Sequence, residues 1–393
     1  MDASGNQSIK RRSGRGCEAP PENKRRKKES GLWSLPDEVL VSCVAQVSRV
    51  DQAALSLVSK RYRSLIASPE MVRTRRLIGC TDATFYVCLR IYPETSPRWF
   101  ILTCKRRRLS PIPSNPYQAQ GSSSFVVVDS GIYVIGGVRN GKRTSDVWFL
   151  ECFSHSWRQA PSMKMARSSA SAHLVDGKIY VFGGLSLRDD KDYSTTWAEV
   201  FDPNTQTWVP LILEPKKKIG IIFQSVVIEG KKIYAVDREK QSFTISVLPT
   251  VSTSVGKLDN KPDYRNEWCV IGKMLFSCAN LGTIVWCEPD ELDWKEVRGL
   301  DVLKNCHLFG SRRHKLPSTP AMVGFRYQIR KLCTNSAGNI VIFWVARKQY
   351  PECSELWSAE ISVERRSDGG SDEVWGYIER IGLVFCFCLC LKL

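Results

Sequence analysis

Histidine and cysteine are the side chains that could bind a metal in this chain of 393 residues, which has four histidines and fifteen cysteines. A metal site that can be recognised in a sequence needs ligands at short, fixed spacing, such as Cys-x-x-Cys. No Cys-x-x-Cys occurs, and none of the histidines has another ligand at helical or short-loop spacing. Cys269, Cys278 and Cys287 recur every nine residues, but they fall on successive predicted strands, where buried cysteine is common. We therefore expect no metal and no cofactor. The histidines are His155, His173, His307 and His314.

A glycine-rich segment at residues 136–142, GGVRNGK, has the G-x-x-x-x-G-K spacing of a phosphate-binding loop. Arg143 stands where a serine or threonine would bind magnesium, and a strand pattern follows in place of the helix whose amino terminus would face the phosphate. The segment is better explained as a glycine pair followed by a hairpin loop. No local signature of a Ser-His-Asp triad is present either, so we expect no catalytic residues.

The formal charge of +17 would suit an acidic partner, but the basic residues are distributed in short runs. No segment resembles a DNA- or RNA-binding module, so nucleic acid is not expected as a partner. Residues 1–30 are polar and should be disordered. They contain no apolar signal peptide, so we expect the cysteines to lie in a reducing compartment and to be free thiols. Within this tail, the basic clusters 10–12 and 24–28 are typical of a two-part nuclear import signal; the alternative is a solubilising tail. We expect a nuclear or cytoplasmic protein, or both.

Residues 32–70 carry the spacing of short amphipathic helices. Pro36, followed by Asp37 and Glu38, is typical of a helix start, because proline and negative charge are favoured in the first turn. Apolar residues then recur at intervals of three and four, first to Val47 and again beyond position 53. The pattern ends at Ser68-Pro69. Two or three helices in about forty residues are near the lower limit of independent stability, so this unit should complete its core against a partner.

The chain beyond residue 84 is a series of strands with an internal repeat. The segment GIYVIGG (131–137) recurs as KIYVFGG (178–184) and, weakened, as KIYAVD (232–237). The first two copies are followed by matching segments that end at Trp157 and Trp208. Successive tyrosines of the repeat are 47 and 54 residues apart, close to the period of about fifty of kelch repeats.

Further strands without the glycine pair follow at 268–276, 283–297 and 339–378. Residues 105–120 form a proline-rich connector. The apolar tail from residue 381 is far shorter than the roughly twenty residues of a membrane helix, so no membrane association is expected. The alternation of side chains in this tail predicts a buried strand. If the strands beyond residue 84 form a ring of sheets, this strand would close the ring against residues 84–103. The last four residues, CLKL (390–393), are close to a prenylation box, but Lys392 occupies a position that is aliphatic in that motif, so we do not expect prenylation.

Residues 32–70 resemble the F-box. The matching segments are LPDEVL (35–40), LSLV (55–58) and SKRYRSL (59–65), in the order typical of that family. The repeat residues, Gly136-Gly137 and Trp157 with their second copies, resemble kelch repeats. Together these segments make the chain similar to the F-box/kelch-repeat proteins abundant in plants.

The resemblance implies a small all-α F-box unit (31–78) followed by an all-β kelch propeller (84–393). A single blade leaves both of its faces uncovered, so blades must stack into a ring, of about six blades here, with five or seven also possible. The clearest repeats span 123–168 and 169–221, and the later blades are degenerate. The resemblance also implies that the chain is the non-catalytic substrate-recognition subunit of an SCF (Skp-cullin-F-box) ubiquitin ligase. A Skp-family adaptor, and through it a cullin, would bind the F-box, and an unknown protein substrate would bind the propeller.

The resemblance places the adaptor contact on seven residues, of which Tyr62 stands where the family often has Trp or Phe. These residues are Leu35, Pro36, Leu40, Val44, Leu55, Val58 and Tyr62. For the substrate we expect propeller loops, represented by Arg139, Asn140, Arg188 and Asp190. Two other hypotheses stay open on the sequence: a propeller metalloenzyme with the helical unit as its cap, and a scaffold that binds the adaptor without causing degradation.

Overall fold

The computed structural model divides the chain into two units, residues 1–80 and 81–393, and each is described by itself. The expected amino-terminal tail and its basic clusters lie outside the described residues. The structure describes residues 35–47, 49–66, 68–78, 84–91, 94–103, 109–129, 131–152, 154–185, 197–211, 222–247, 251–259, 268–279, 283–304, 329–335, 337–348, 353–368 and 371–388.

The first unit is helical. Its helices are α1 (Asp37–Ala45), α2 (Arg49–Val58), α3 (Lys60–Ile66) and α4 (Pro69–Leu77). Pro36 is the N-cap of α1, so the helix start expected there is confirmed. The expected stop at Ser68-Pro69 is confirmed for α3, which ends at Ile66, but the sequence analysis missed that a further helix, α4, begins at Pro69. Ser68 Oγ accepts a hydrogen bond from the Met71 amide at 3.2 Å, and Pro69 is the first residue of α4, because proline at this position lacks only an N–H that a helix leaves unpaired.

The core of this unit is shared by α1, α3 and α4, and includes Leu40, Tyr62 and Met71. Two buried polar side chains satisfy the carboxyl end of α1. Arg75 Nη1 donates to the carbonyls of Ala45 at 2.7 Å and Val47 at 2.6 Å, and Gln52 Nε2 donates to that of Val44 at 2.7 Å. A helix leaves its last carbonyls without partners, so these bonds fix α4 and α2 to the end of α1.

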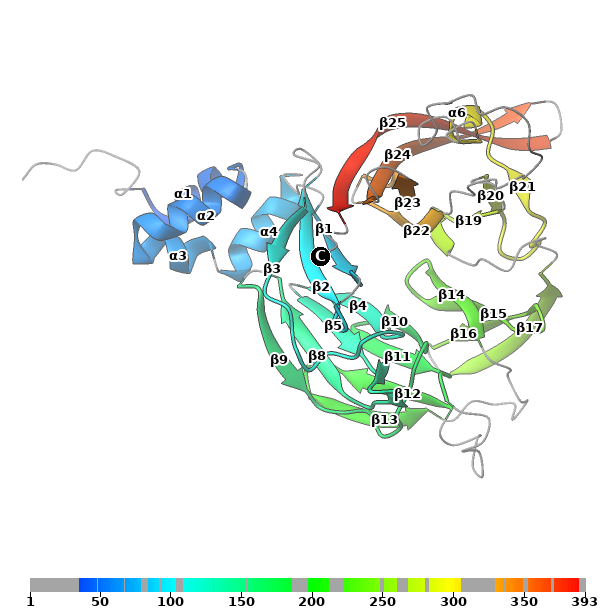
Figure 1. The fold of residues 1–393 in the computed structure, drawn as a ribbon, viewed down its shortest axis with the longest axis horizontal. Coiled ribbons are helices and arrows are strands. Elements are labelled where there is room, and N and C mark those ends of the chain that lie inside the picture. Colours follow the sequence, from blue (N-terminus) through cyan, green and yellow to red (C-terminus); the bar gives the residue numbers. More distant parts are fainter. Residues whose placement is uncertain are drawn as a thin grey trace, which may run out of the picture. The chain divides into compact units, whose positions relative to one another are not determined.

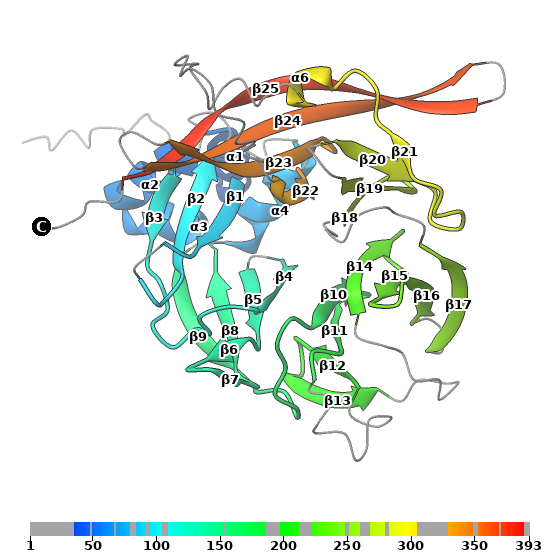
Figure 2. The ribbon, with the colours of Figure 1, turned by 45° about the vertical axis from the view of Figure 1, so that its right-hand side comes forward.

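The second unit is a six-bladed β-propeller, as the sequence predicted (Figures 1 and 2). The first blade has three strands, β1 (Thr84–Leu89), β2 (Arg98–Thr103) and β3 (Leu109–Ile112). The second comprises β4 (Ser124–Val128), β5 (Gly131–Ile135), β8 (Val147–Glu151) and β9 (Ser156–Ala160), with the small hairpin β6 (Val138–Arg139) and β7 (Lys142–Arg143) between β5 and β8. The third comprises β10 (Ser171–Val175), β11 (Lys178–Phe182), β12 (Ala198–Asp202) and β13 (Thr207–Leu211).

The remaining three blades also have four antiparallel strands each. The fourth comprises β14 (Ile222–Ile228), β15 (Lys232–Asp237), β16 (Gln241–Ser246) and β17 (Ser252–Leu258). The fifth comprises β18 (Trp268–Ile271), β19 (Met274–Cys278), β20 (Ile284–Cys287) and β21 (Lys295–Glu296), and is followed by α6 (Asp301–Lys304). The sixth comprises β22 (Ile329–Thr334), β23 (Ile340–Lys348), β24 (Cys353–Asp368) and β25 (Ser371–Cys388).

The blades are held together by six apolar clusters, one at each seam between neighbouring blades. The second and third blades, for example, share Tyr133 and Phe201, whose ring centroids are 5.5 Å apart. The sixth and first blades share Phe343 and Phe100, which closes the ring. Each blade buries its two faces against the neighbouring blades, so the apolar core runs continuously around the ring.

The repeat seen in the sequence is a repeat of strand register. Ile132 lies opposite Leu150, and Leu150 opposite Trp157; in the next blade Ile179 lies opposite Phe201, and Phe201 opposite Trp208. The two tryptophans thus occupy the same place on the outer strands of successive blades.

The carboxyl-terminal tail forms the expected strand and closes the ring against blade one, with its hydrogen bonds made to another strand. Residues 374–378 and 381–388 belong to one 18-residue strand, β25, which pairs with β24 along its whole length. It joins blade six and does not hydrogen-bond to residues 84–103 within the described chain. The ring is instead closed there by side chains, such as Phe100 and Phe385, whose centroids are 5.6 Å apart.

The connector before blade two contains a strand that the sequence analysis missed. β3 lies at the edge of its sheet, where Pro111 costs no ladder bond on the open side. The irregular residues after it lie against the same blade: Ser114 Oγ accepts from the Trp99 amide at 3.2 Å, and Gln118 Oε1 from Trp99 Nε1 at 2.8 Å.

Candidate protein-interaction surfaces

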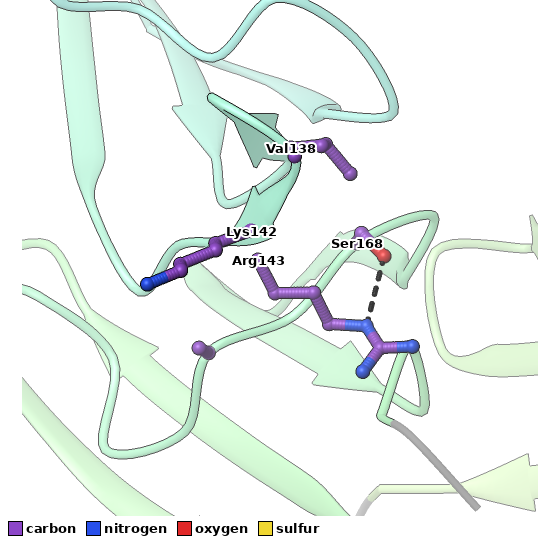
Figure 3. A pocket seen from close by; sticks show the side chains of 6 residues that line it. Val138, Lys142, Arg143 and Ser168 are labelled. Atoms are coloured by element: carbon purple, nitrogen blue, oxygen red, sulfur yellow. Dashed lines mark hydrogen bonds between the residues drawn. The ribbon is translucent and has the colours of Figure 1, made fainter.

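The β6–β7 hairpin of blade two borders a cavity of about 490 Å³ (Figure 3). The hairpin has a two-residue turn, in which Asn140 and Gly141 have φ of 50° and 75°. Positive φ at both turn residues is the type I′ geometry that Asn-Gly favours. The expected hairpin loop is therefore confirmed, and the segment is not a phosphate loop. The cavity is lined by Val138, Gly141, Lys142, Arg143, Ala166 and Ser168.

The glycine pair before the hairpin lets two other loops approach it. A Cβ on Gly136 would lie 2.5 Å from the Arg167 carbonyl oxygen, and one on Gly137 would lie 2.7 Å from the Gly121 carbonyl oxygen. The same backbones are bonded: the Gly137 amide donates to Arg167 O at 2.8 Å, and the Val138 amide to Gly121 O at 2.8 Å. The hairpin is thus fixed at its base on both sides, because only glycine permits these distances.

A buried ion pair shapes the loop across the cavity. Arg167 and Glu199 are both almost completely buried, and Arg167 Nη2 lies 2.9 Å from Glu199 Oε1. Arg167 Nη1 also donates to the carbonyls of Gly183 at 2.7 Å and Trp197 at 2.9 Å. The Glu199 carboxylate accepts a hydrogen bond from the Lys164 backbone amide at 2.7 Å. Every charged atom here has partners, so the pair holds residues 164–168 in one conformation.

The described part of the cavity wall includes two basic side chains, Lys142 and Arg143. Arg143 Nε donates to Ser168 Oγ at 3.1 Å, while the exposed Lys142 ammonium has no ion-pair or hydrogen-bond partner in the described part of the chain (Figure 3). Arg139 lies 3.7 Å from the Asp146 carboxylate, and its guanidinium is 5.8 Å from the ring centre of Tyr117. The Tyr117 ring is 56% exposed.

Two of the four residues expected to bind substrate lie at this surface, Arg139 and Asn140; Arg188 and Asp190 lie outside the described residues. The Asn140 amide donates to Gln120 Oε1 at 3.3 Å. Lys142, Arg143 and Ser168, which line the cavity, were not among the residues expected from the sequence. The basic pair directly after an Asn-Gly turn was the available signal for the first two, whereas Ser168 is brought to the hairpin by the fold.

A second cavity, of about 600 Å³, lies between β21 and the β24–β25 hairpin and is walled by Trp286 and Trp375. Its arginines are paired with acids: Arg298 lies 2.6 Å from Glu373, and Arg365 pairs with both Glu288 and Asp372. These bonds explain why the pKa of Asp372 is lowered, first by Ser367 and then by Arg365. The long β24–β25 hairpin (Figure 2) is also tied to blade five by backbone hydrogen bonds between Arg298 and residues 374 and 376. The second cavity therefore lies where blades five and six meet.

The seven residues expected to contact an adaptor divide by exposure. Leu40, Val44 and Tyr62 are buried in the helical unit's own core, and Leu35 and Leu55 pack against it. Pro36 and Val58 are exposed. The burial of the first three follows from their spacing, because they lie on the inward faces of α1 and α3.

An exposed apolar surface adjoins the two exposed members. Leu57 and Val58, at the end of α2, are 78% and 62% exposed, and Val39 on α1 is 45% exposed. Arg61, at the start of α3, donates to Asp37 Oδ1 at 2.6 Å and to Leu35 O at 3.1 Å, which brings the α2–α3 junction to the first turn of α1. We call Pro36, Val39, Leu57 and Val58 the apolar strip; Val39 and Leu57 were not among the expected residues.

The two histidines in the described chain have hydroxyl neighbours. His173 Nε2 lies 2.8 Å from Ser225 Oγ and 3.1 Å from Ser171 Oγ, and burial lowers the pKa of His173 to about 4. His155 lies 3.5 Å from the Tyr86 hydroxyl. His307 and His314 lie outside the described residues. Among the residues that are described, no three His, Cys, Asp or Glu side chains are placed to hold a metal.

No helix in the described ranges is long and apolar enough to cross a membrane.

Comparisons with known proteins give the same division of the chain. The F-box domain family matches residues 32–74, and the family described as FKB95, Kelch-repeats domain, matches residues 85–385. A putative F-box/kelch-repeat protein of Arabidopsis thaliana is 34% identical over 363 residues, covering 88% of this chain and 86% of the relative. An F-box/kelch-repeat protein of the same plant is 33% identical, covering 91% and 93%. Among solved structures, that of YjhT covers 75% of this chain and 94% of its own, at 13% identity and a TM-score of 0.49.

Proposed function

Because this chain belongs to the F-box/kelch-repeat family, we propose that it is the substrate-recognition subunit of an SCF ubiquitin ligase. Its helical unit would bind a Skp-family adaptor, and through it a cullin, while its propeller would bind the protein to be ubiquitinated. Such a subunit needs no catalytic residues. It accelerates ubiquitin transfer by raising the effective concentration of the target near the conjugating enzyme.

The apolar strip is the observation that carries this proposal. The helical unit buries its own core, yet it leaves Leu57 and Val58 largely in water at the junction of two helices. Adjacent exposed apolar side chains of this size mark a protein contact, since burying each one contributes about 1.5–3 kcal/mol. We therefore assign the adaptor contact to the strip. Leu40, Val44 and Tyr62 would act indirectly, by packing in the core that holds the helices in place.

Co-purification of the full chain with a Skp-family adaptor tests the proposal. We expect Leu57→Asp/Val58→Asp to abolish capture, because two carboxylates would have to be desolvated at the contact. Leu77→Asp is the control: Leu77 is 86% exposed and is the last residue of α4, outside the apolar strip. Full capture by the double variant, with unchanged circular dichroism, would refute the assignment.

Target turnover separates a ligase subunit from a scaffold. Proximity labelling that depends on adaptor binding would identify the proteins held by the propeller. We expect their half-lives to lengthen in cells that carry the Leu57→Asp/Val58→Asp variant. Unchanged half-lives with intact adaptor binding by the wild-type chain would indicate a scaffold.

A further inference from the structure

Blade one has three strands in the described chain, where each of the other five blades has four. The strand that it lacks is the inner one. The interval from the end of β3 to the start of β4 (112 to 124) matches that from β9 to β10 (160 to 171), so β3 holds the place of the outer strand β9. Counting inward, β1 holds the place of β5, and no described strand holds that of β4. By the spacing of β4 and β5, such a strand would begin at residue 77, which is the last residue of helix α4.

The side chains beside this place are apolar and exposed. Leu174 of β10 packs in the cluster between blades two and three, which includes Val126 of the inner strand β4. Val127 has the register of Leu174 one blade earlier, so it faces blade one. It is 65% exposed, and Phe125, on the same face of β4, is 47% exposed although its ring meets that of Trp99 at a centroid distance of 5.7 Å. An inner strand in blade one would cover both side chains.

The place forms a groove whose floor is the inner edge of β1. On the side of blade six, Val87 and Leu89 of β1 and Cys333 of the inner strand β22 are only partly buried against the shared cluster. The groove is therefore continuous with the apolar seams on both sides of blade one. An edge strand such as β1 presents backbone N–H and C=O groups with which another chain can pair.

The other blades show what kind of chain fits such a place. Their inner strands lie along the inner side of the ring, and each has a neighbouring blade on either side (Figure 1). A strand covered on both faces favours short runs of apolar and β-branched residues, such as SFVVV in β4 and SAHLV in β10. Because β4 and β22 stand on the two sides of the groove, a single extended chain fits there, and the edge of a folded sheet does not.

We propose that the inner edge of β1 binds an extended apolar segment of a target protein as the fourth, inner strand of blade one. The proposal rests on the proposed function, since it names the kind of segment by which the propeller would hold its substrate. Backbone hydrogen bonds to β1 would supply affinity, and contacts with Phe125 and Val127 would select apolar side chains at alternate positions. A target offers such a segment in a free terminus or an unfolded region, where its backbone is not already paired.

Fluorescence anisotropy with the full chain tests the proposal. The probe is a fluorescein-labelled peptide with SFVVV between pairs of lysines, which keep it soluble and disfavour binding by net charge, because the protein is itself basic. Two control peptides carry N-methyl groups at alternate residues, one in each frame, since N-methylation removes the donors from one edge of a strand. We expect one of them to bind like the parent and the other to bind at least about tenfold more weakly. Binding of both like the parent, or no binding of the parent, would overturn the proposal.

A variant of the groove tests its location. Val127→Glu should weaken binding of the parent peptide at least about tenfold, because a carboxylate in the groove would be desolvated without a partner. Val209→Glu is the matched control, since Val209 is a 58% exposed valine on the outer strand β13 of blade three. The milder Val127→Thr, expected to weaken binding at least about threefold, covers the case in which the glutamate disturbs folding. Equal loss in Val209→Glu would overturn the proposal.

Hydrogen exchange shows where the peptide lies. The amides of residues 84–89 should exchange more slowly when the parent peptide is bound, and those of β13 should not change. Strong protection of residues 84–89 in the free chain, with no peptide binding, would mean that another part of the chain occupies the edge, and would overturn the proposal. Adaptor capture separates the two proposals: capture without peptide binding refutes this inference alone, and peptide binding without capture refutes the proposed function alone.

Discussion

The buried Arg167–Glu199 pair allows a quantitative test of how the propeller holds its hairpin surface. In Arg167→Met, a side chain of similar length removes the guanidinium. The carbonyls of Gly183 and Trp197 then lose a donor each, and the Glu199 carboxylate keeps only its backbone amides. A buried acceptor left without a partner costs about 1–3 kcal/mol, and breaking a buried ion pair from one side costs about 3–5 kcal/mol. We expect a loss of about 3–5 kcal/mol.

Urea unfolding of the full chain, followed by tryptophan fluorescence, measures this loss. The signal reports on the propeller, because every tryptophan except Trp33 lies in residues 81–393. The control is Lys273→Met, which removes an ion pair with Glu229 of 3.1 Å between side chains that are 82% and 51% exposed. Screened pairs of this kind contribute about 0–1 kcal/mol. A loss below about 1 kcal/mol in Arg167→Met, equal to the control, would refute the reasoning.

Three further outcomes are expected. Stability should fall by up to about 3 kcal/mol as the pH drops from 6.5 towards 4, because His173 stays neutral in the folded state while the unfolded chain takes up a proton; His173→Gln should flatten this part of the pH–stability curve. Gly136→Ala should cost more than about 2 kcal/mol, since its Cβ would lie 2.5 Å from a backbone oxygen, whereas Gly141→Ala, with nothing within 4 Å, should cost about 1 kcal/mol in the same urea assay. Arg75→Met should leave carbonyls at the end of α1 unpaired and lower the helical unit's protection from hydrogen exchange by about 2–4 kcal/mol, with no change in the propeller.

The propeller could be predicted from the sequence because its repeat is local. Ile132 and Ile179 hold equivalent register positions in blades two and three, so equal spacing in the chain becomes equal position in the two sheets. The pairing of the tail could not be predicted in this way. Alternation at residues 381–388 indicates a strand, but not which edge it joins, and hydrogen bonding to β24 continues a hairpin that was already formed.

The proposed binding surfaces could be predicted only in part, because burial depends on packing between helices. The spacing of Leu40, Val44 and Tyr62 marks an apolar face, and only the structure distinguishes a face that covers its own core from one that remains open. Leu57 and Val58 follow in the same run and are the exposed ones. Similarly, Ser168 meets the hairpin because the glycine pair lets the loop of the next blade approach.

Closure of the ring by side chains has a consequence for synthesis on the ribosome. Phe100 and Leu102 of blade one find their apolar neighbours on blade six, whose strands β22–β25 are translated last. At about 5–20 residues per second, the first blade waits on the order of ten seconds or more for its final seam. During that interval its outer aromatic face is open to water. The nascent chain should therefore depend on chaperones most strongly between the emergence of β2 and that of β25. A premature stop within blade six should leave an incomplete ring with an exposed apolar face that is prone to aggregation.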